Sequence, residues 1–458
     1  MLSRRAITKI QAAIAIIVVL VIIVAGAAYY YYAAAPPKPV AKEIKIGLLY
    51  PISGAMAPLG NEQCEGTKMA IDMINERGGV EGYKITYVVA DAKSDPKVAV
   101  SEAERLCTIE KVPIIIGTYA SPLLLAASEV AEKYKTVYWE VGAITDGATK
   151  RGYKYLLRIQ VIGGDFGIVS GRFVAEVVAP KLGVDVKSLR TAIIFEDGPY
   201  GSSVADYNKK TCERFGIPIV LYEGYKAAAT DLSFLITKLK DAKPDVILAT
   251  SYYTDTVLSF RQAKELGLKF KVFIGHGAGH GLPDTYKTLG EDITYIFNTD
   301  PPPPAGINPE AIKPELRPIL KEYVDRWKAK FGRLPLTHSH MGFSHTWVLL
   351  TEVLPKVIKE YKEVTPDNIV KAAYAIDIPE GGTTMGYGVK FSTPDKPADT
   401  IMGDWFGRGD KHVGQNIRCM PMVMQWVPGG ELYNAYPTKY ALKPPVIPLP
   451  PTSPYAAA

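Results

Sequence analysis

The stretch Ile44–Pro96, IKIGLLYPISGAMAPLGNEQCEGTKMAIDMINERGGVEGYKITYVVADAKSDP, decides the fold because it reads as a strand, a helix and a second strand. The apolar run KIGLLY predicts the first strand, and the amphipathic stretch Asn61–Arg77 predicts a helix that ends at two glycines. ITYVVAD predicts the second strand, and Asp95 with Pro96 has the pattern of an N-cap and a first-turn proline. This order of elements predicts a parallel pair of strands with a right-handed crossover.

The same alternation continues along most of the chain. VPIIIGTY and TVYWE predict two further strands of the first series. After a break near Ile159–Gly167, TAIIF, IPIVLYEG, DVILAT and KVFIG predict a second series, with helices at about Tyr200–Arg214, Asp231–Lys240 and Thr254–Leu266. We therefore expect an α/β fold of two doubly wound parallel-sheet lobes joined by a hinge of several crossings. Ligands of such sheets bind at the carboxyl ends of the strands, so a cleft between the lobes is the expected site.

The pattern also predicts the boundaries of each part. They are a cytoplasmic stub or signal (1–11), a transmembrane helix (12–32), a linker (33–43), lobe 1 (44–158 and 282–382), lobe 2 (159–281 and 383–436) and a Pro-rich tail (437–458).

The N-terminal segment predicts a membrane anchor. Ala12–Tyr32 carries no charge and is long enough, as a helix, to cross a hydrocarbon layer of about 30 Å. Arg4, Arg5 and Lys9 precede it, so the positive-inside rule places the rest of the chain outside the cytoplasm. A cleaved secretory signal is the alternative, but this apolar core is longer than the usual signal core. The opening RRAITKIQAAIAI also resembles prepilin-like signals, whose processing would leave the helix attached.

Composition and motifs disfavour several classes of function. The net charge of +6 is small for 458 residues and is not gathered into a basic stripe, so no nucleic-acid partner is expected. The chain lacks G-x-S-x-G, H-E-x-x-H and G-x-x-x-x-G-K-[ST], and GHGAGHG does not fit G-x-G-x-x-G, so no enzyme is expected. A metal site is conceivable at the histidines of GHGAGH and HSHMGFSH, but histidines in such loops are more often polar loop residues. We expect neither a metal nor a cofactor.

The quoted N-terminal block resembles the start of the type I solute-binding proteins of branched-chain amino acid and amide importers. IIIGTYASP, RGYKYLLR, AIIFEDGPYG and SYYTDTVLSFRQAKELGL follow in the order and spacing of that family, over roughly Ile44–Asp377, with a weaker return near Val389–Pro428. The resemblance implies the extracytoplasmic binding component of an ABC importer, with permease and ATPase subunits as partners. The implied ligand is an amino acid of the branched-chain type, captured by lobe closure. The alternatives are a sensory-receptor ectodomain, or a binder of an amide, a urea-like compound or a carboxylate.

On the lobe 1 side, the resemblance places one wall of the cleft at the loop that runs from Ser53 to Leu59, with Leu59 where leucine-binding members have an aromatic residue. Ser121 matches a serine that holds the ligand carboxylate, and a helix N-terminus suits an anion, although a plain N-cap serine is the alternative. Gly142 and Ala143 match a pair whose backbone meets the ligand, and an isoleucine follows where a threonine is usual.

On the lobe 2 side, Tyr200 matches an aromatic residue that covers the ligand, and Tyr252 or Tyr253 matches another. Asp255 starts a predicted helix and lies in a loop that faces the cleft, although it is also a possible helix cap.

One departure concerns the ligand's charge. In amino-acid-binding members an acidic residue in the loop after VFIG neutralises the ligand's ammonium, and Gly277 takes that place here. An unpaired ammonium in a closed cleft costs several kcal/mol. We therefore expect either that Asp255 or Glu140 replaces the acid, or that the ligand has no ammonium.

The four cysteines, Cys64, Cys107, Cys212 and Cys419, lie far apart in the sequence and form no CxxC pair. The lobe 1 disulfide of the resembled proteins corresponds to Ser94 and Ala120, so that bridge is absent. Exposure outside the cytoplasm favours oxidation, and a bridge between Cys212 and Cys419 within lobe 2 is the pairing we expect.

Overall fold

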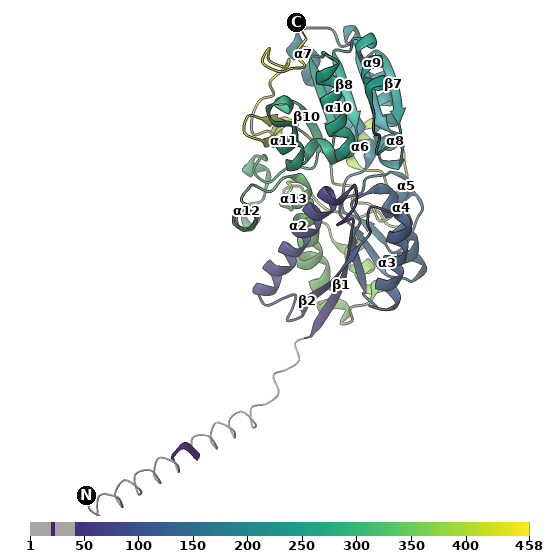
Figure 1. The fold of residues 1–458 in the computed structure, drawn as a ribbon. Coiled ribbons are helices and arrows are strands. Elements are labelled where there is room, and N and C mark those ends of the chain that lie inside the picture. The colour runs from purple at the N-terminus through teal and green to yellow at the C-terminus, as the bar shows by residue number, and fades with distance from the viewer. Residues whose placement is uncertain (1–19, 23–41, 458) are drawn as a thin grey trace, which may run out of the picture. The chain divides into compact units, whose positions relative to one another are not determined.

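The structure is a computed structural model that describes residues 20–22 and 42–457. It divides into a unit Met1–Lys42 and a compact unit Glu43–Ala458, and the second unit holds two lobes, drawn one above the other in Figure 1. The predicted transmembrane span Ala12–Tyr32 lies outside the described residues, apart from Leu20–Ile22. Within residues 20–22 and 42–457, no helix combines the length and the apolar composition needed to cross a membrane.

Lobe 1 is built on a parallel five-stranded sheet in the order β2-β1-β3-β4-β5. Its strands are β1 (Glu43–Tyr50), β2 (Lys84–Asp91), β3 (Ile114–Gly117), β4 (Val137–Glu140) and β5 (Leu156–Arg158). Apolar side chains of β1 pack on one face against α2 (Ala57–Glu76), α12 (Arg317–Phe331), α13 (Thr337–Val348) and α15 (Pro366–Ala375). The other face packs against α3 (Pro96–Thr108) and α4 (Ser121–Lys133). Burial on both faces explains why these strands appear as continuous apolar runs in the sequence.

Lobe 2 is built on a seven-stranded sheet in the order β12-β11-β10-β9-β8-β6-β7. Its strands are β6 (Thr191–Glu196), β7 (Ile219–Tyr225), β8 (Val246–Thr250), β9 (Val272–His276), β10 (Phe297–Asp300), β11 (Met422–Val427) and β12 (Glu431–Tyr436). The helices α6 (Gly163–Phe173) and α8 (Pro199–Phe215) cover one face, while α9 (Ser233–Ala242) and α10 (Tyr253–Glu265) cover the other. The predicted α/β fold with parallel sheets is confirmed, with β11 and β12 added as an antiparallel edge.

About half of the remaining described helices and helical turns lie between β10 and β11. The α-helices are α5 (Gly147–Lys150), α7 (Ala179–Leu182), α11 (Pro283–Leu289), α14 (Leu354–Lys356) and α16 (Ile401–Phe406). Short 3₁₀ or π-helical turns are η1 (Val174–Val178), η2 (Val186–Ser188), η3 (Ala278–Gly281), η4 (Gly290–Ile293), η5 (Pro309–Ala311), η6 (Pro314–Leu316), η7 (Leu349–Val353), η8 (Val357–Tyr361) and η9 (Thr438–Tyr440).

The lobe boundaries differ from the predicted ones. Lobe 2 continues past residue 281, because β10 pairs in parallel with β9 and ends only at Asp300. Residue 383 does not begin lobe 2, since Val389 and Phe391 pack in the same hydrophobic cluster as β1. Both errors arise where the chain crosses between the lobes, because a crossing segment packs on whichever lobe lies beside it.

The predicted break at Ile159–Gly167 is instead the start of α6. Its glycines disfavour a helix by roughly 1 kcal/mol each relative to alanine, which is why the sequence indicated a break. They also let α6 approach α8 closely. A Cβ atom added at Gly167 would lie 2.5 Å from the backbone nitrogen of Asn208, and one added at Gly171 would lie 2.4 Å from Cγ2 of Thr211. Tertiary packing therefore overrides the local propensity.

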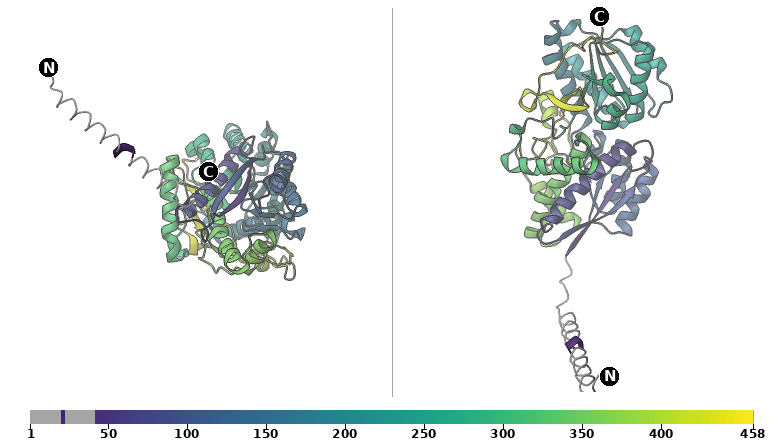
Figure 2. Two further views of the ribbon diagram at one scale, coloured as in Figure 1. Left: turned by 90° about the horizontal axis from the view of Figure 1, so that it is seen from below. Right: turned by 60° about the vertical axis from the view of Figure 1, so that its left-hand side comes forward.

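The C-terminal segment is not a loose tail. The amide of Leu449 donates to the carbonyl of Lys271 at 2.9 Å, beside the start of β9. Tyr455 is buried, stacks on Phe270 with ring centroids 5.4 Å apart, and donates its hydroxyl to the carbonyl of Phe260 at 3.0 Å. Figures 1 and 2 show this end of the chain at lobe 2. Leu449 and Tyr455 thus pack on lobe 2, whereas Tyr440 packs in the cluster that contains β1.

The predicted bridge between Cys212 and Cys419 is absent. All four cysteines are free thiols. Cys212 packs in the lobe 2 cluster beside α6 and α8, whereas Cys419 packs in the cluster that contains α3 and α4, so the two side chains belong to different cores.

A buried group of charges, here called the Arg408 cluster, joins the two lobes. It consists of Arg408 with Asp146, Asp165, Asp399 and Asp410. Asp146 immediately precedes the short helix α5 in lobe 1, and Asp165 lies in the first turn of α6 in lobe 2, so the cluster spans both lobes. The Arg408 side chain is only 1% exposed, and its Nε donates to both carboxylate oxygens of Asp399 at 2.9 and 3.0 Å.

Candidate ligand-binding site

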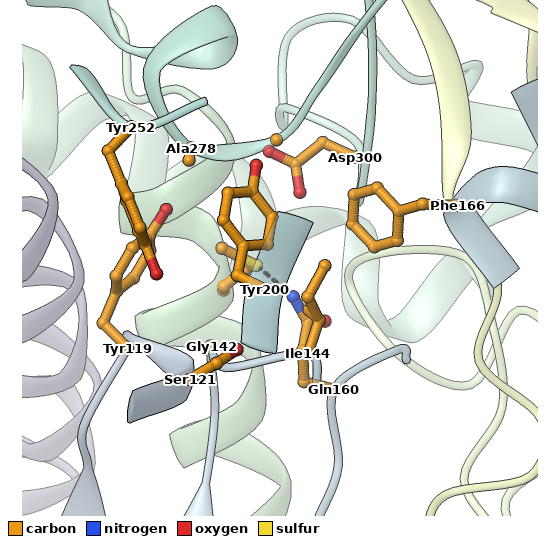
Figure 3. Close-up of a pocket in the computed structure, with 12 residues that line it drawn as sticks. Tyr119, Ser121, Gly142, Ile144, Gln160, Phe166, Tyr200, Tyr252, Ala278 and Asp300 are labelled. Atoms are coloured by element: carbon orange, nitrogen blue, oxygen red, sulfur yellow. Dashed lines mark hydrogen bonds between the residues drawn. The ribbon is translucent and has the colours of Figure 1, made fainter. Parts of the chain in front are cut away.

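A small cavity lies between the two lobes, at the carboxyl ends of the strands (Figure 3). Its volume is about 20 Å³. Lobe 1 strand ends and the first crossing supply Tyr119, Ser121, Gly142, Ile144 and Gln160, lobe 2 supplies Phe166, Tyr200, Tyr252, Gly277, Ala278 and Asp300, and Met341 of α13 completes the wall. Parallel strands bring their carboxyl ends to one edge of each sheet, and here the two edges face each other.

Five of the predicted site residues line this cavity. They are Ser121, Gly142, Tyr200, Tyr252 and Gly277. Each of them lies within four residues after the end of a strand that the sequence also predicts.

The lobe 1 residues of this set are held by polar contacts within the loop. The Oγ of Ser121 accepts from the amide of Thr145 at 3.2 Å. Ser121 is the first residue of α4 rather than its cap, because the cap position is Ala120. The amide of Gly142 donates to Oε1 of Glu140 at 2.6 Å. These contacts fix the loops so that the first turn of α4 faces the cavity.

The two lobe 2 tyrosines form an aromatic wall. The rings of Tyr200 and Tyr252 lie with their centroids 5.0 Å apart. The hydroxyl of Tyr200 donates to the carbonyl of His276, so Tyr200 is fixed by the end of β9. The hydroxyl of Tyr252 is buried and has no hydrogen-bond partner among the described residues. It is therefore available to a ligand.

The other five predicted residues do not line the cavity. Ser53 is tied to β2, because its Oγ donates to Oδ2 of Asp91 at 2.6 Å. Leu59 is fully buried in the lobe 1 core. The amide of Ala143 donates to Oε1 of Glu140 at 2.6 Å, and its carbonyl accepts from Nη1 of Arg158 at 3.4 Å.

Tyr253 and Asp255 also turn away from the cavity. The Tyr253 hydroxyl shares a hydrogen bond with Thr288 at 3.0 Å on the outside of lobe 2. The Asp255 carboxylate accepts from the amides of Ala228 and Ala229, each at 3.1 Å, and so stabilises the loop after β7.

Glu140, the second predicted replacement carboxylate, likewise serves the backbone. Oε1 accepts from Gly142 and Ala143, and Oε2 accepts from the amide of Thr118 at 2.9 Å. Burial raises the pKa of Glu140 to about 7, and these amide hydrogen bonds oppose that rise. Neither Glu140 nor Asp255 lines the cavity.

The carboxylate that does line the cavity is Asp300, which sequence reasoning missed. It is the last residue of β10, the strand FNTD, in which every residue is buried. Its Oδ2 has no hydrogen-bond partner among the described residues. Burial raises the pKa of Asp300 well above its usual value. The polar sequence of β10 and the prolines after it resemble a loop, and only the rule that sites follow parallel strands would have indicated it.

The six histidines of the chain are all buried. Several join segments distant in sequence: His345 Nδ1 pairs with the carbonyl of Val141 at 3.0 Å, and His340 Nδ1 with that of Pro302 at 2.9 Å. Among residues 20–22 and 42–457, no group of three or more His, Cys, Asp or Glu side chains is arranged to hold a metal ion. The histidines act as internal polar contacts in the structure.

A family model and a similar protein of known family both match most of this chain. Residues 43–425 match the family model described as periplasmic binding protein. The chain is 35% identical over 401 residues to Leu/Ile/Val-binding protein homolog 8 of Brucella abortus (strain 2308), which covers 87% of this chain and 92% of the relative.

Two solved structures share the fold at low sequence identity. The branched-chain amino acid transporter substrate binding protein LivJ from Streptococcus pneumoniae, in complex with isoleucine, has a TM-score of 0.69 and 20% identity, and the match covers 89% of this chain and 100% of that one. A solute binding protein of an ABC transporter from Rhodopseudomonas palustris BisB5, in complex with 3,4-dihydroxybenzoic acid, has a TM-score of 0.68 and 21% identity, with 86% and 95% covered.

The fold, the interlobe cavity and these matches define a solute-binding protein, and the chain belongs to the periplasmic binding protein family. Within that family it is a type I binding protein of the branched-chain amino acid group.

Proposed function

We propose that this protein captures a small polar organic ligand, in first place an amino acid, and delivers it to an ABC importer. The observation that carries the proposal is that both lobes supply walls of one enclosed cavity. At about 20 Å³ the cavity holds about one water molecule, so an organic ligand enters only when the lobes separate. A ligand that contacts both walls stabilises the closed form selectively, which is the requirement for closure on binding.

The polar groups of the cavity support a ligand with a carboxylate. Ser121 begins α4, and the unpaired amides at a helix N-terminus attract an anion. Isoleucine and 3,4-dihydroxybenzoic acid, which the two structural neighbours hold, both carry a carboxylate. An amide, a urea-like compound or a simple carboxylate ranks second for this chain, because Gly277 stands where the resembled amino-acid-binding proteins have an acidic residue.

Delivery to a transporter requires that the binding unit stay near the membrane outside the cytoplasm. We propose that Ala12–Tyr32 is a retained anchor and that residues 33–43 are its spacer, supported by the uncharged span and its basic flank. N-terminal sequencing of the mature protein and protease treatment of intact cells check this. A mature chain that begins after Tyr32 would refute the anchor.

Small-angle scattering of the purified chain with leucine, isoleucine and valine tests the binding proposal. We expect a smaller radius of gyration with at least one of them, because the ligand fills the cleft and holds the lobes together. Loss of uptake of the same amino acid in cells that lack the protein would support delivery to an importer. An unchanged radius with every amino acid and every small carboxylate, at saturation, would contradict capture by lobe closure.

A further inference from the structure

Asp300 is the one acidic residue in the cavity wall, and the protein does not neutralise it. Its side chain is 3% exposed, and its nearest basic group is Nε2 of His338 at 3.4 Å from Oδ2. Among the described residues, no lysine or arginine forms an ion pair with Asp300. A buried carboxylate without a partner costs free energy in the empty protein, so its presence calls for a reason outside the fold.

His338 does not supply the missing positive charge. Burial lowers the pKa of His338 to about 3, so the imidazole is neutral at physiological pH. Neither ring nitrogen has a hydrogen-bond partner among the described residues. The ring packs edge-on against Tyr119, with centroids 5.4 Å apart. His338 thus acts as a neutral polar support behind Asp300.

Aromatic rings surround the same space (Figure 3). Phe166, Tyr200 and Tyr252 line the cavity with Asp300, and a Cβ added at Gly277 would lie 3.4 Å from Phe166 Cε1 and 3.5 Å from Asp300 Cγ. The glycine therefore leaves room between the carboxylate and the Phe166 ring. Ring faces attract cations, by roughly 0.5–2 kcal/mol each, and repel anions.

We propose that Asp300 is the counter-ion for a positively charged nitrogen of the ligand, enclosed by the rings of Phe166, Tyr200 and Tyr252. The inference rests on the proposed function and deepens it. The ligand is then a zwitterion or a cation, with its carboxylate, where present, at Ser121. The acid lies at the end of β10, one strand along the sheet from the loop of Gly277. Glu140 and Asp255 do not line the cavity, and their oxygens accept from backbone amides.

Isothermal calorimetry with the purified chain and four test ligands examines the inference. Leucine and 4-methylpentanoate differ only in the ammonium group. N,N,N-trimethylglycine is a second ligand with a positively charged nitrogen, and 3,4-dihydroxybenzoate is a second ligand without one. We expect the parent to bind a nitrogen cation more tightly than either anion. Asp300→Asn should weaken that binding at least tenfold, equivalent to about 1.4 kcal/mol, and should not weaken 4-methylpentanoate. Asp255→Asn is the matched control and should keep the preference of the parent.

The outcomes separate the inference from the proposed function. If the parent prefers an anionic ligand and still closes on it, or if Asp300→Asn binds the cations as tightly as the parent, the inference is wrong and capture by closure stands. If the loss follows Asp255→Asn instead, the counter-ion is Asp255. If no ligand of either class binds or closes the lobes, the proposed function itself fails. Thermal unfolding checks that Asp300→Asn is folded, and we expect its stability to equal or exceed that of the parent because a buried carboxyl group without a paired cation is replaced by a neutral amide.

Discussion

Two buried acidic regions lie between the lobes, and they differ in how their charge is balanced. In the Arg408 cluster, Asp165 accepts from the Thr400 hydroxyl at 2.7 Å and lies 3.3 Å from Nη2 of Arg408, while Asp399 accepts from Nε of the same guanidinium. In the cavity, the histidine beside Asp300 is neutral, and no lysine or arginine of the described residues pairs with this carboxylate. Both regions are largely buried, but only one contains its own cation.

The difference separates a structural role from a ligand-binding role. A buried charge with a well-placed partner is part of the fold, and removal of that partner leaves a costly unpaired charge. A buried charge without a partner gains its partner from outside. On this reasoning the Arg408 cluster holds crossing segments together, and Asp300 has the role of ligand counter-ion that we propose for it.

The largest expected effect is on stability at the Arg408 cluster. Arg408→Met should lower the free energy of unfolding by about 3–5 kcal/mol, because Asp399 and its neighbours lose their buried cation. Lys210→Met is the control: its pair with Asp206 is exposed and should contribute no more than about 0.5 kcal/mol. Urea unfolding of both variants measures the difference. If Arg408→Met and Lys210→Met lower the free energy of unfolding by the same amount, the Arg408 cluster does not stabilise the fold. The contrast drawn with Asp300 would then be wrong.

A second, smaller effect tests the helix that both regions share. α6 carries Asp165 toward the Arg408 cluster and Phe166 toward the cavity. Gly167→Ala should destabilise the protein by about 1–3 kcal/mol, because the new methyl would meet the backbone nitrogen of Asn208 at 2.5 Å. Ligand affinity should also fall, because a displaced α6 moves Phe166 in the cavity wall.

Gly147→Ala is the matched control, since the nearest atom to its added methyl is Oγ1 of Thr145 at 3.9 Å. Its free energy of unfolding should stay within about 0.5 kcal/mol of the parent. Thermal unfolding and calorimetry on the two variants provide both readouts. Equal stability of Gly167→Ala and the parent would show that α6 and α8 have room to separate.

The smallest expected effect is a pH dependence of stability at two histidines, His338 beside Asp300 and His412 beside Asp399 of the Arg408 cluster. Burial lowers the pKa of each to about 3, and nearby arginines contribute at His412. Between about pH 3 and pH 6.5 the unfolded histidine binds a proton that the folded one does not, so each contributes stability that is lost as pH falls. The stability advantage of the parent over His338→Gln should shrink by up to roughly 1.4 kcal/mol per pH unit between pH 6 and pH 5.

The same shrinkage is expected for His412→Gln. In an Arg408→Met background, the pH-dependent loss of stability should become smaller for His412→Gln, because a cation that repels protonated His412 is gone. For His338→Gln it should stay the same. Urea unfolding at pH 7, 6 and 5 makes the measurement. A difference that does not change with pH would mean that the imidazole is accessible to solvent in the folded protein.

The sequence predicted the repeating parts of the fold well and the crossings poorly. Strands such as β1 and β8 are continuous apolar runs because both faces are buried, so a local pattern reveals them. β10, with the polar sequence FNTD, and α6, with four glycines, are set by their neighbours and carry no such pattern. Half of the predicted site residues line the cavity, since strand ends were predicted but side-chain directions were not.

The sequence by itself determined the class of protein: two lobes of parallel sheet, an interlobe site at strand ends, and membership of the binding-protein family. Those features depend on residue patterns that act over a few turns or strands. Only the tertiary structure decided which carboxylate lines the cavity. Asp255, Glu140 and Asp300 all follow or end strands, but Asp255 and Glu140 accept from backbone amides while Asp300 enters the cavity unpaired. That choice depends on where distant backbone amides lie, which no local sequence pattern specifies.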